Sequence, residues 1–400
     1  MNCLYIVKDD PVSQNFIGGG ASIYYDQLRC LSLAGFNIIL LHYTSESKRK
    51  TCDEFYANNK EDLTFVNSVC SAIINLNYSE NMSLFGLIQS KLSDITNKSG
   101  TAYYSIYNGI ARQIKQIVRE EKIDFIWAQH LHPTILALHQ HNVPVIYMHH
   151  DWIYKVKALR FNKPIDIKQK EIECRIVRKV NGFVSGSYSE FKEAMAIGNN
   201  NSYYIPISYP EVPEVSDKDF AQIPDIVHLG GMGATANRIG LKNFIEKAWP
   251  AMSLMPERLL IIGNLEGAGE DLKTELKKYK TTGFVKDLAP LLRYGDIHII
   301  PWHENTGQRT RLPLILSYGQ VVVAVDQSVK GFPELINGEN CILVQTVEEM
   351  APAILNVIYD KLLRKRLAQN AIKTFKNCFA TSKLIGRYQD AIYNIVELKN

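Results

Sequence analysis

Long apolar runs are missing from the sequence, and none approaches the roughly 20 residues that a membrane-spanning helix needs. The apolar start, Met1–Val7, is too short for a signal peptide and is followed at once by Lys-Asp-Asp. The seven cysteines are scattered, and no two of them form a C-x-x-C pair. Scattered thiols in a chain without a signal indicate the reduced cytoplasm and argue against a zinc site. We therefore expect a cytoplasmic protein.

A strong net charge is also missing, because 45 basic and 41 acidic side chains leave only +4. So mild a charge does not by itself imply a nucleic-acid partner. The dinucleotide fingerprint G-x-G-x-x-G is absent from the first predicted turn, where Gly18–Gly20 follow a predicted strand at Asn2–Val7. The second predicted strand, Asn37–His42, ends in a histidine where an NAD site would have an acid. Both features count against NAD, and a plain glycine turn remains one interpretation of Gly18–Gly20.

What the sequence does contain describes two globular domains. A chain of 400 residues suits two domains of roughly 150–200 residues each. A strand, a glycine loop and a helix open the chain, and the same order restarts at Ile226–Leu229. Between them, 206–224 holds four prolines amid acids and is predicted to be a linker, with its D-x-D triplet at 217–219 solvated and not metal-binding. We thus expect domains at 1–205 and 225–381.

The most informative stretch is the loop Trp302–Arg311, which leaves the carboxyl end of a predicted strand and enters a predicted helix at Leu312–Tyr318. Open α/β sheets bind ligands at that end of their strands, and helix N-termini favour anions. Gly307 lets the backbone come close, and Arg309 and Arg311 add forked cationic donors suited to phosphate. The loop is therefore a candidate phosphate site, with a solvated basic loop as the alternative.

Four histidines follow two neighbouring predicted strands, 124–129 and 143–148, at the end of each strand. They are His130, His132, His149 and His150. Because imidazole changes charge near neutral pH, such a cluster at the carboxyl edge of a sheet suits acid/base chemistry or contact with sugar hydroxyls. Zinc binding is one alternative, although H-x-H and H-H-D without a third grouped ligand are weak evidence for it. A structural role for each histidine is also open.

A basic segment follows these histidines. Lys155–Lys179 contains nine lysines and arginines against three acids. This composition favours a solvated helical face. The alternative is a patch for anionic lipid or for an acidic acceptor, because each basic residue near such a surface adds attraction. This alternative predicts peripheral contact with an anionic membrane surface, at the inner face of the membrane.

The second half of the chain resembles a known family. One branch of the family 4 retaining GT-B glycosyltransferases carries P-L-x-x-G-x-G-T-R-x-K in front of E-A-x-x-x-G-x-P-V-V-A. The residues that fall on this pattern without a gap are Pro301, Gly307, Arg309, Arg311 (for lysine), Gly319, Val322, Val323 and Ala324. Further segments that resemble the same branch are HLGGMGATANR at 228–238, GFVKDL at 283–288 and GFPELINGENCILV at 331–344. The chain departs from the family at Thr306 and Leu314, where the family has glutamates, and Glu304 is the nearby acid that could substitute for one of them.

The resemblance implies an α/β fold of the GT-B type, with two facing Rossmann-like domains, a deep interdomain cleft and a last helix, 382–400, that packs back on the first domain. It implies a metal-independent, retaining hexosyltransferase. This enzyme would move a sugar, with glucose the best guess, from a UDP-sugar to a hydroxyl of a saccharide or lipid-linked saccharide, in polysaccharide or envelope glycan synthesis. The donor is a substrate, and no cofactor is expected.

The resemblance also assigns roles by position. His130 and Arg309 are expected to be catalytic, with His132 the rival of His130 because the spacing is one residue off. His150 and Asp151 are expected on the acceptor side. The expected donor-binding residues are Gly19, Gly20, Gly231, Asn237, Arg238, Gly263, Phe284, Val285, Gly307, Arg311 and Glu334. The departures from the family keep a non-catalytic nucleotide-sugar-binding subunit open, and a nucleotide-sugar epimerase of the same fold is the other alternative.

Overall fold

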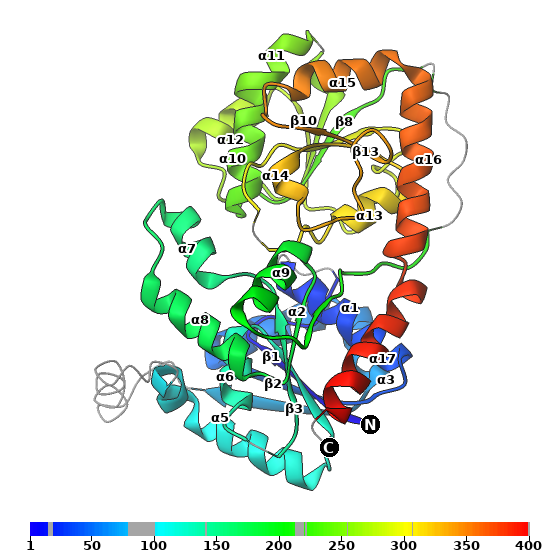
Figure 1. Cartoon of the computed structure of the whole chain (residues 1–400). Helices are drawn as coiled ribbons and strands as arrows, with labels where there is room; N and C mark the ends of the chain where they lie inside the picture. Colours follow the sequence, from blue (N-terminus) through cyan, green and yellow to red (C-terminus); the bar gives the residue numbers. More distant parts are fainter. Residues whose placement is uncertain are drawn as a thin grey trace. The chain divides into compact units, whose positions relative to one another are not determined.

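The structure is a computed structural model that forms two compact units. It describes residues 1–14, 19–78, 101–140, 142–212, 220, 222–253, 255–305 and 307–398. Unit 1 comprises Met1–Ile207 and Leu384–Asn400, and unit 2 comprises Ser208–Lys383. Each unit is built on one parallel sheet with helices packed against it (Figure 1). Within the described ranges, no helix is long and apolar enough to cross a membrane.

The described part of unit 1 contains a seven-stranded parallel sheet in the order β3-β2-β1-β4-β5-β6-β7. Its strands are β1 (Asn2–Lys8), β2 (Asn37–Ser45), β3 (Cys70–Tyr78), β4 (Phe125–Gln129), β5 (Val145–His149), β6 (Gly182–Ser185) and β7 (Ser202–Tyr204). Its helices are α1 (Gly19–Leu33), α2 (Glu46–Asn58), α3 (Lys60–Val69), α5 (Thr101–Glu120), α6 (Leu131–Ala137), α7 (Ile153–Phe161), α8 (Ile167–Lys179), α9 (Tyr188–Ile197) and α17 (Thr381–Glu397). The central strands β4 and β5 are buried along their whole length, as expected of a parallel sheet that is covered on both faces.

The last helix, α17, packs into unit 1. Tyr388 lies against Trp127 of β4, with ring centroids 5.7 Å apart. Gly182 of β6 approaches the same helix so closely that a Cβ there would lie 2.2 Å from Ile395 Cδ1. Glycine at this position therefore lets α17 close over the core of the unit.

The described part of unit 2 contains a six-stranded parallel sheet in the order β10-β9-β8-β11-β12-β13. Its strands are β8 (Ile226–Leu229), β9 (Leu259–Ile262), β10 (Lys280–Gly283), β11 (Ile297–Ile300), β12 (Val321–Val325) and β13 (Cys341–Val344). Its helical segments are α10 (Thr235–Asn243), the π-helix η1 (Phe244–Ala248), α11 (Trp249–Met252), the 3-10 turn η2 (Pro256–Arg258), α12 (Glu270–Leu276), α13 (Leu312–Ser317), α14 (Asp326–Val329), α15 (Met350–Tyr359) and α16 (Lys361–Cys378).

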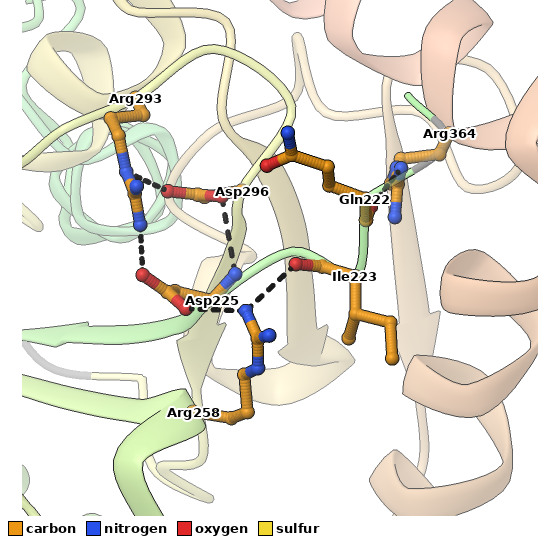
Figure 2. Close-up of polar contacts among 7 residues, drawn as sticks. All are labelled: Gln222, Ile223, Asp225, Arg258, Arg293, Asp296 and Arg364. Carbon is orange, nitrogen blue, oxygen red and sulfur yellow. Dashed lines mark hydrogen bonds and ion pairs between the residues drawn. The ribbon is translucent and has the colours of Figure 1, made fainter. Parts of the chain in front are cut away.

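Ion pairs fix the amino-terminal edge of this sheet (Figure 2). Asp225 and Asp296 are buried just before β8 and β11, and Arg293 pairs with both. Arg258 pairs with Asp225 from a second side, and the Asp225 amide donates to Asp296 Oδ1 at 3.2 Å. The network therefore holds the starts of two neighbouring strands together, at the edge opposite to their carboxyl ends.

The segment that the prolines predict to be a linker belongs to unit 2 in its described parts from Ser208 onward. The Tyr209 hydroxyl donates to the Thr310 carbonyl at 3.0 Å. At the far end, Arg364 of α16 donates to the carbonyls of Phe220 and Gln222 (Figure 2 draws the contact with Gln222). The D-x-D triplet of this segment lies outside the described residues.

Both sheets reverse their strand order at one point, and that point places the candidate residues. In unit 1 the reversal lies between β1 and β4, and in unit 2 between β8 and β11. Open α/β sheets bind ligands at the carboxyl ends of the strands beside this reversal. His130 directly follows β4, and the loop Trp302–Arg311 directly follows β11. Each unit therefore carries its candidate residues where its fold favours a ligand.

Candidate functional site

The backbone of His130 is strained. Its φ of +66° and ψ of 173° belong to a region that residues other than glycine rarely adopt. The His130 amide donates to the Met148 carbonyl at 3.0 Å, and the His130 carbonyl accepts from the Thr134 hydroxyl at 2.7 Å. These bonds hold the strained conformation, which is typical of functional positions. The imidazole has no hydrogen-bond partner among the described residues, so its nitrogens remain available to a ligand.

The imidazole of His130 stacks on that of His150, with ring centroids 3.6 Å apart and an angle of 29° between the planes. The Tyr24 ring contacts both histidines edge-on, at centroid distances of 5.8 and 5.6 Å. A Cβ on Gly20 would lie 3.5 Å from His130 Nε2, so the start of α1, where Gly19 and Gly20 stand, runs beside the imidazole. The fold thus brings Gly20 and two of the predicted histidines together.

Both stacked imidazoles are neutral at physiological pH. Burial, followed by the charges of His149, His132 and Lys8, lowers the pKa of His130 to about 3. Burial also lowers the pKa of His150 well below its ordinary value, with His130 and His149 as the next causes. A group that stays neutral from pH 5 to pH 8 is a poor general acid or base. The pair is therefore suited to hydrogen bonds with a ligand and less suited to proton transfer.

The other residues of this edge have different surroundings. Buried His149 lies 3.0 Å from the Tyr147 hydroxyl and 3.3 Å from Glu190, which is a structural environment. Asp151 is exposed directly after His150. Among the described residues, no group of three or more histidines, cysteines, aspartates and glutamates could hold a metal ion.

In unit 2, two glycine turns follow β8 and β9 and lie against each other. A Cβ on Gly263, whose φ is +141°, would lie 2.5 Å from the Gly230 carbonyl oxygen. Only glycine fits such an approach. The Met232 amide donates to the Asn264 carbonyl at 2.8 Å, and Gly231 stands beside the same carbonyl. The carboxyl ends of these strands therefore carry two closely packed glycine turns, where the absence of side chains on the glycines lets a phosphate come close to the backbone.

Asn237 and Arg238, both expected to bind the donor, hold these turns in place. Asn237 Nδ2 donates to the Gly231 carbonyl at 3.0 Å. Arg238 Nη1 donates to the Met232 carbonyl at 3.2 Å and to the Gly267 carbonyl at 3.4 Å. The two side chains thus link the start of α10 to the glycine turns.

The loop after β11 holds Arg309 with backbone carbonyls. Arg309 Nε donates to the Ser328 carbonyl at 3.3 Å, and Nη2 donates to the Glu304 carbonyl at 3.1 Å. Gly307 has a φ of +60°, which glycine adopts without strain and which lets the loop turn back. These contacts fix the Arg309 guanidinium at the strand reversal of unit 2.

Arg311 behaves differently from Arg309. It stands at the start of α13, and its positive charge is the second cause, after burial, that lowers the pKa of His228 to about 4. Because His228 belongs to β8, the charge of Arg311 acts on the sheet, whereas the Ser328 and Glu304 carbonyls hold Arg309.

The remaining expected residues frame this edge. Phe284 follows β10 and is 49% exposed, whereas Val285 packs on an apolar cluster. Leu314, which stands where the family has a glutamate, packs on the same cluster. Thr306, the other departure, lies outside the described residues. Glu334 is partly buried in the segment before β13.

Three residues of these edges were not found from the sequence: Tyr24, Gln129 and Gly240. A Cβ on Gly240 of α10 would lie 3.0 Å from the Pro301 carbonyl oxygen, so this glycine lets the helix meet the loop after β11. Gln129 is a fully buried amide at the end of an otherwise apolar strand, and that contrast was the available signal. Nothing in the pattern of α1 marks Tyr24.

Comparison with known proteins agrees with this geometry. Residues 223–360 match the family model of glycosyl transferases group 1. No curated protein sequence matches the chain. HepE from Anabaena, solved in complex with UDP, is similar with a TM-score of 0.68 at 12% identity, over 98% of this chain and 100% of that chain. Sucrose-phosphate synthase from Thermosynechococcus elongatus is similar with a TM-score of 0.69 at 14% identity, over 100% of both chains.

A glycosyltransferase from Rickettsia africae is also similar, with a TM-score of 0.65 at 15% identity, over 99% of this chain and 98% of that chain. At such identities the likeness shows the fold. The predicted GT-B class is confirmed, because both units have the Rossmann-like strand order and the matches extend over nearly the whole chain. The chain therefore has the GT-B fold, and its residues 223–360 are similar to the glycosyl transferases group 1 family.

Proposed function

We propose that the protein is a retaining glycosyltransferase that moves a hexose, with glucose the best guess, from a UDP-sugar to a hydroxyl of a saccharide or lipid-linked saccharide. Synthesis of a polysaccharide or an envelope glycan is the expected setting. The observation that carries the proposal is the strand reversal of the glycosyl transferases group 1 domain. It presents two closely packed glycine turns and the fixed guanidinium of Arg309. HepE from Anabaena, which has the same fold, is solved with UDP and with UDP-glucose, which supports this choice of donor.

The main task in such a transfer is to stabilise the charge that builds on the leaving diphosphate. Arg309 supplies a permanent positive charge for this task. The backbone amides of Gly231 and Gly233, which donate to no described residue, supply dipoles. In this scheme the proton of the acceptor hydroxyl passes to the leaving phosphate. Neutral His130 then contributes a hydrogen bond to the sugar or the diphosphate, which agrees with its low pKa.

An assay with a radioactive donor tests the proposal. A thermal-shift panel of nucleotide sugars first identifies the donor, and the labelled donor is then incubated with and without saccharide acceptors. Transfer of label that needs an acceptor supports the proposal. Binding without transfer or hydrolysis would favour a non-catalytic subunit, and conversion of the donor without an acceptor would favour an epimerase.

Activity is expected to survive EDTA. The expectation rests on Arg309 and the backbone dipoles, which can balance the charge of the diphosphate without a divalent cation. Turnover before and after treatment with the chelator measures the effect. Complete loss of turnover, restored by manganese, would show that a metal ion balances this charge.

We also propose that unit 1 contacts an anionic membrane through the corner between α7 and α8, at the rim of the unit (Figure 1). Every residue from 160 to 168 is exposed. The large apolar side chains of this corner are Phe161, Ile165 and Ile167, which are 59%, 44% and 62% exposed. Its cationic side chains are Arg160, Lys163 and Lys168. Apolar side chains among cations are typical of a surface that enters the head-group layer of an anionic bilayer.

Substitutions at this corner are expected to weaken vesicle binding. Lys163→Gln should lower the partition onto vesicles that contain phosphatidylserine by about fivefold, since each such residue contributes about 1 kcal/mol. Phe161→Ser should lower it to a similar extent, because the ring enters the head-group layer. Co-sedimentation with phosphatidylserine vesicles, and with phosphatidylcholine vesicles as the neutral reference, measures the partition.

The matched control is Leu362→Ser in unit 2. Leu362 is 82% exposed and stands between Lys361 and Lys365. Like Phe161, it is an exposed apolar side chain near cationic residues, but it lies outside the corner between α7 and α8. Its substitution should leave binding unchanged. The proposal would be contradicted if Leu362→Ser, but not Phe161→Ser, weakened vesicle binding. It would also be contradicted if the wild-type protein bound phosphatidylserine and phosphatidylcholine vesicles equally.

A further inference from the structure

A chain of buried hydrogen bonds runs from β4 to the stacked histidines. Its members are Trp127, Gln27, Gln129, Tyr5, Tyr24 and His150. Gln129 stands at its centre and is fully buried. Gln129 Nε2 donates to Gln27 Oε1 and to the Tyr5 hydroxyl, both at 2.6 Å. Gln129 Oε1 lies 2.7 Å from His150 Nε2.

The two ends of this chain set the direction of every bond in it. The Trp127 indole N–H can only donate, and it donates to Gln27 Oε1 at 3.0 Å. The Tyr24 backbone carbonyl can only accept, and it accepts from the Tyr5 hydroxyl at 2.9 Å. Both Gln27 Oε1 and the Tyr5 oxygen are therefore acceptors toward Gln129, which places the amide nitrogen of Gln129 on their side. The amide oxygen of Gln129 is left for the histidine and can only accept.

We propose that Gln129 positions His150 as the tautomer protonated at Nε2, so that His150 Nδ1 is a fixed acceptor for a hydroxyl group of the substrate. The ligand class is an uncharged polyhydroxyl group, such as a saccharide hydroxyl. This inference deepens the proposed function, and the role of the hydroxyl rests on it. The tautomer itself follows from the hydrogen bonds alone.

The surroundings of His150 agree with an acceptor that stays neutral. The groups that face it are His130 in the stack, His149 beside it on β5, the edge of Tyr24 and the Gln129 amide. None of these carries a negative charge that would favour an imidazolium, and burial lowers its pKa well below the ordinary value. Nδ1 has no hydrogen-bond partner among the described residues. A neutral nitrogen with a free lone pair binds an O–H group and offers nothing to an anion.

Nitrogen NMR of the intact protein, labelled with 15N-histidine, tests the tautomer directly. His150→Gln identifies the signals of His150. The wild-type protein should show a protonated Nε2 and an unprotonated Nδ1, without change between pH 6 and pH 8. Gln129→Met removes the amide oxygen that accepts from His150 Nε2, so His150 in this variant should no longer prefer protonation at Nε2. Gln129→Glu places a carboxylate on the Nε2 proton and should raise the pKa of His150 relative to the wild type, because an adjacent negative charge favours the imidazolium.

The matched control is Gln140→Met. Gln140 is also a buried glutamine of unit 1, and its side chain bonds to the backbone at Asn142 and Val143, without contact to the histidines. Its substitution should lower the free energy of unfolding and leave the His150 signals unchanged. A wild-type His150 protonated at Nδ1, or one charged at pH 7, would overturn the proposal.

Kinetics then separate this inference from the proposed function. If transfer is observed, Gln129→Met should raise the KM for the acceptor or donor sugar by about fivefold, with the affinity for UDP unchanged, because one neutral hydrogen bond is weakened. If the wild-type protein has the expected tautomer but Gln129→Met leaves the KM unchanged, His150 Nδ1 has no role in binding the substrate. Absence of any transfer would count against the proposed function and leave the tautomer result standing.

Discussion

Replacing His130 with alanine is expected to lower kcat by about 10²-fold or more, while UDP still binds within a few-fold of the wild-type affinity. The reason is that the imidazole stands at the strand reversal of unit 1 with no hydrogen-bond partner among the described residues. A contact made mainly in the transition state changes kcat and leaves the ground-state affinity of the donor nearly unchanged. Steady-state kinetics and calorimetry with UDP measure the two quantities.

The strained backbone of His130 supplies a sharper variant. Glycine adopts a φ of +66° without the strain of roughly 1–3 kcal/mol that other residues bear there. His130→Gly should therefore fold well and still be slow, which assigns the loss to the missing ring. His132→Ala is the control and should keep most of its activity. If only His132→Ala loses activity, the catalytic role belongs to His132 and not to His130. If the variants of both histidines keep full activity, the histidine cluster has only a structural role.

Replacing Arg309 with alanine is expected to weaken UDP binding by at least tenfold. Charge-assisted contacts to phosphate are worth about 1.5–3 kcal/mol each, and every 1.4 kcal/mol corresponds to a tenfold change in Kd. The Ser328 and Glu304 carbonyls hold the guanidinium in place, so little side-chain entropy is lost when the diphosphate binds. Calorimetry with UDP measures the change.

The same carbonyl contacts make a structural effect of Arg309→Ala the competing explanation. Arg311→Ala is the matched control, because Arg311 belongs to the same loop but its charge acts on His228 of the sheet, and its loss should change UDP affinity less. Thermal unfolding separates the two effects. A lower melting temperature with unchanged UDP affinity would mean that Arg309 only holds the loop, and the proposed diphosphate site would be wrong.

Much of the fold follows from local pattern. The residue pattern predicts strands at 226–229, 259–262 and 321–325, and the structure has the same bounds. Each is a short run of mostly branched apolar residues, and a parallel strand buried on both faces needs no other signal. The position of the loop after β11 is also predicted by the sequence. The apolar run of the strand ends before a segment that contains Gly307 and Arg309, and this change in composition marks the carboxyl end of the strand.

Weaker local signals gave poorer predictions. The segment 52–98 could not be interpreted from the sequence, yet it contains the edge strand β3, whose residues are mostly only partly buried and are mixed with serine and asparagine. A strand at the edge of a sheet is stabilised by its partner β2 more than by its own pattern. The residue pattern is helical throughout 348–399 and marks no boundary before the last helix, whereas the structure divides this stretch into α15, α16 and α17, with Asp360 capping the second of them. The residues on both sides of these breaks favour helix, so local propensity does not locate the breaks. Packing decides where one helix ends and the next begins in a new direction.

The sequence by itself determined which chemical groups stand at the strand ends: the glycine turns, Arg309 and the histidines. Only the tertiary structure decided which of them meet. Gln129 contacts Tyr5 across 124 residues and Gln27 across 102, and these contacts set the tautomer of His150. The stack of His130 on His150 likewise depends on β4 and β5 lying side by side with their ends level. Such contacts have no local signature, because the sheet order and not the spacing along the chain brings the side chains within hydrogen-bond distance.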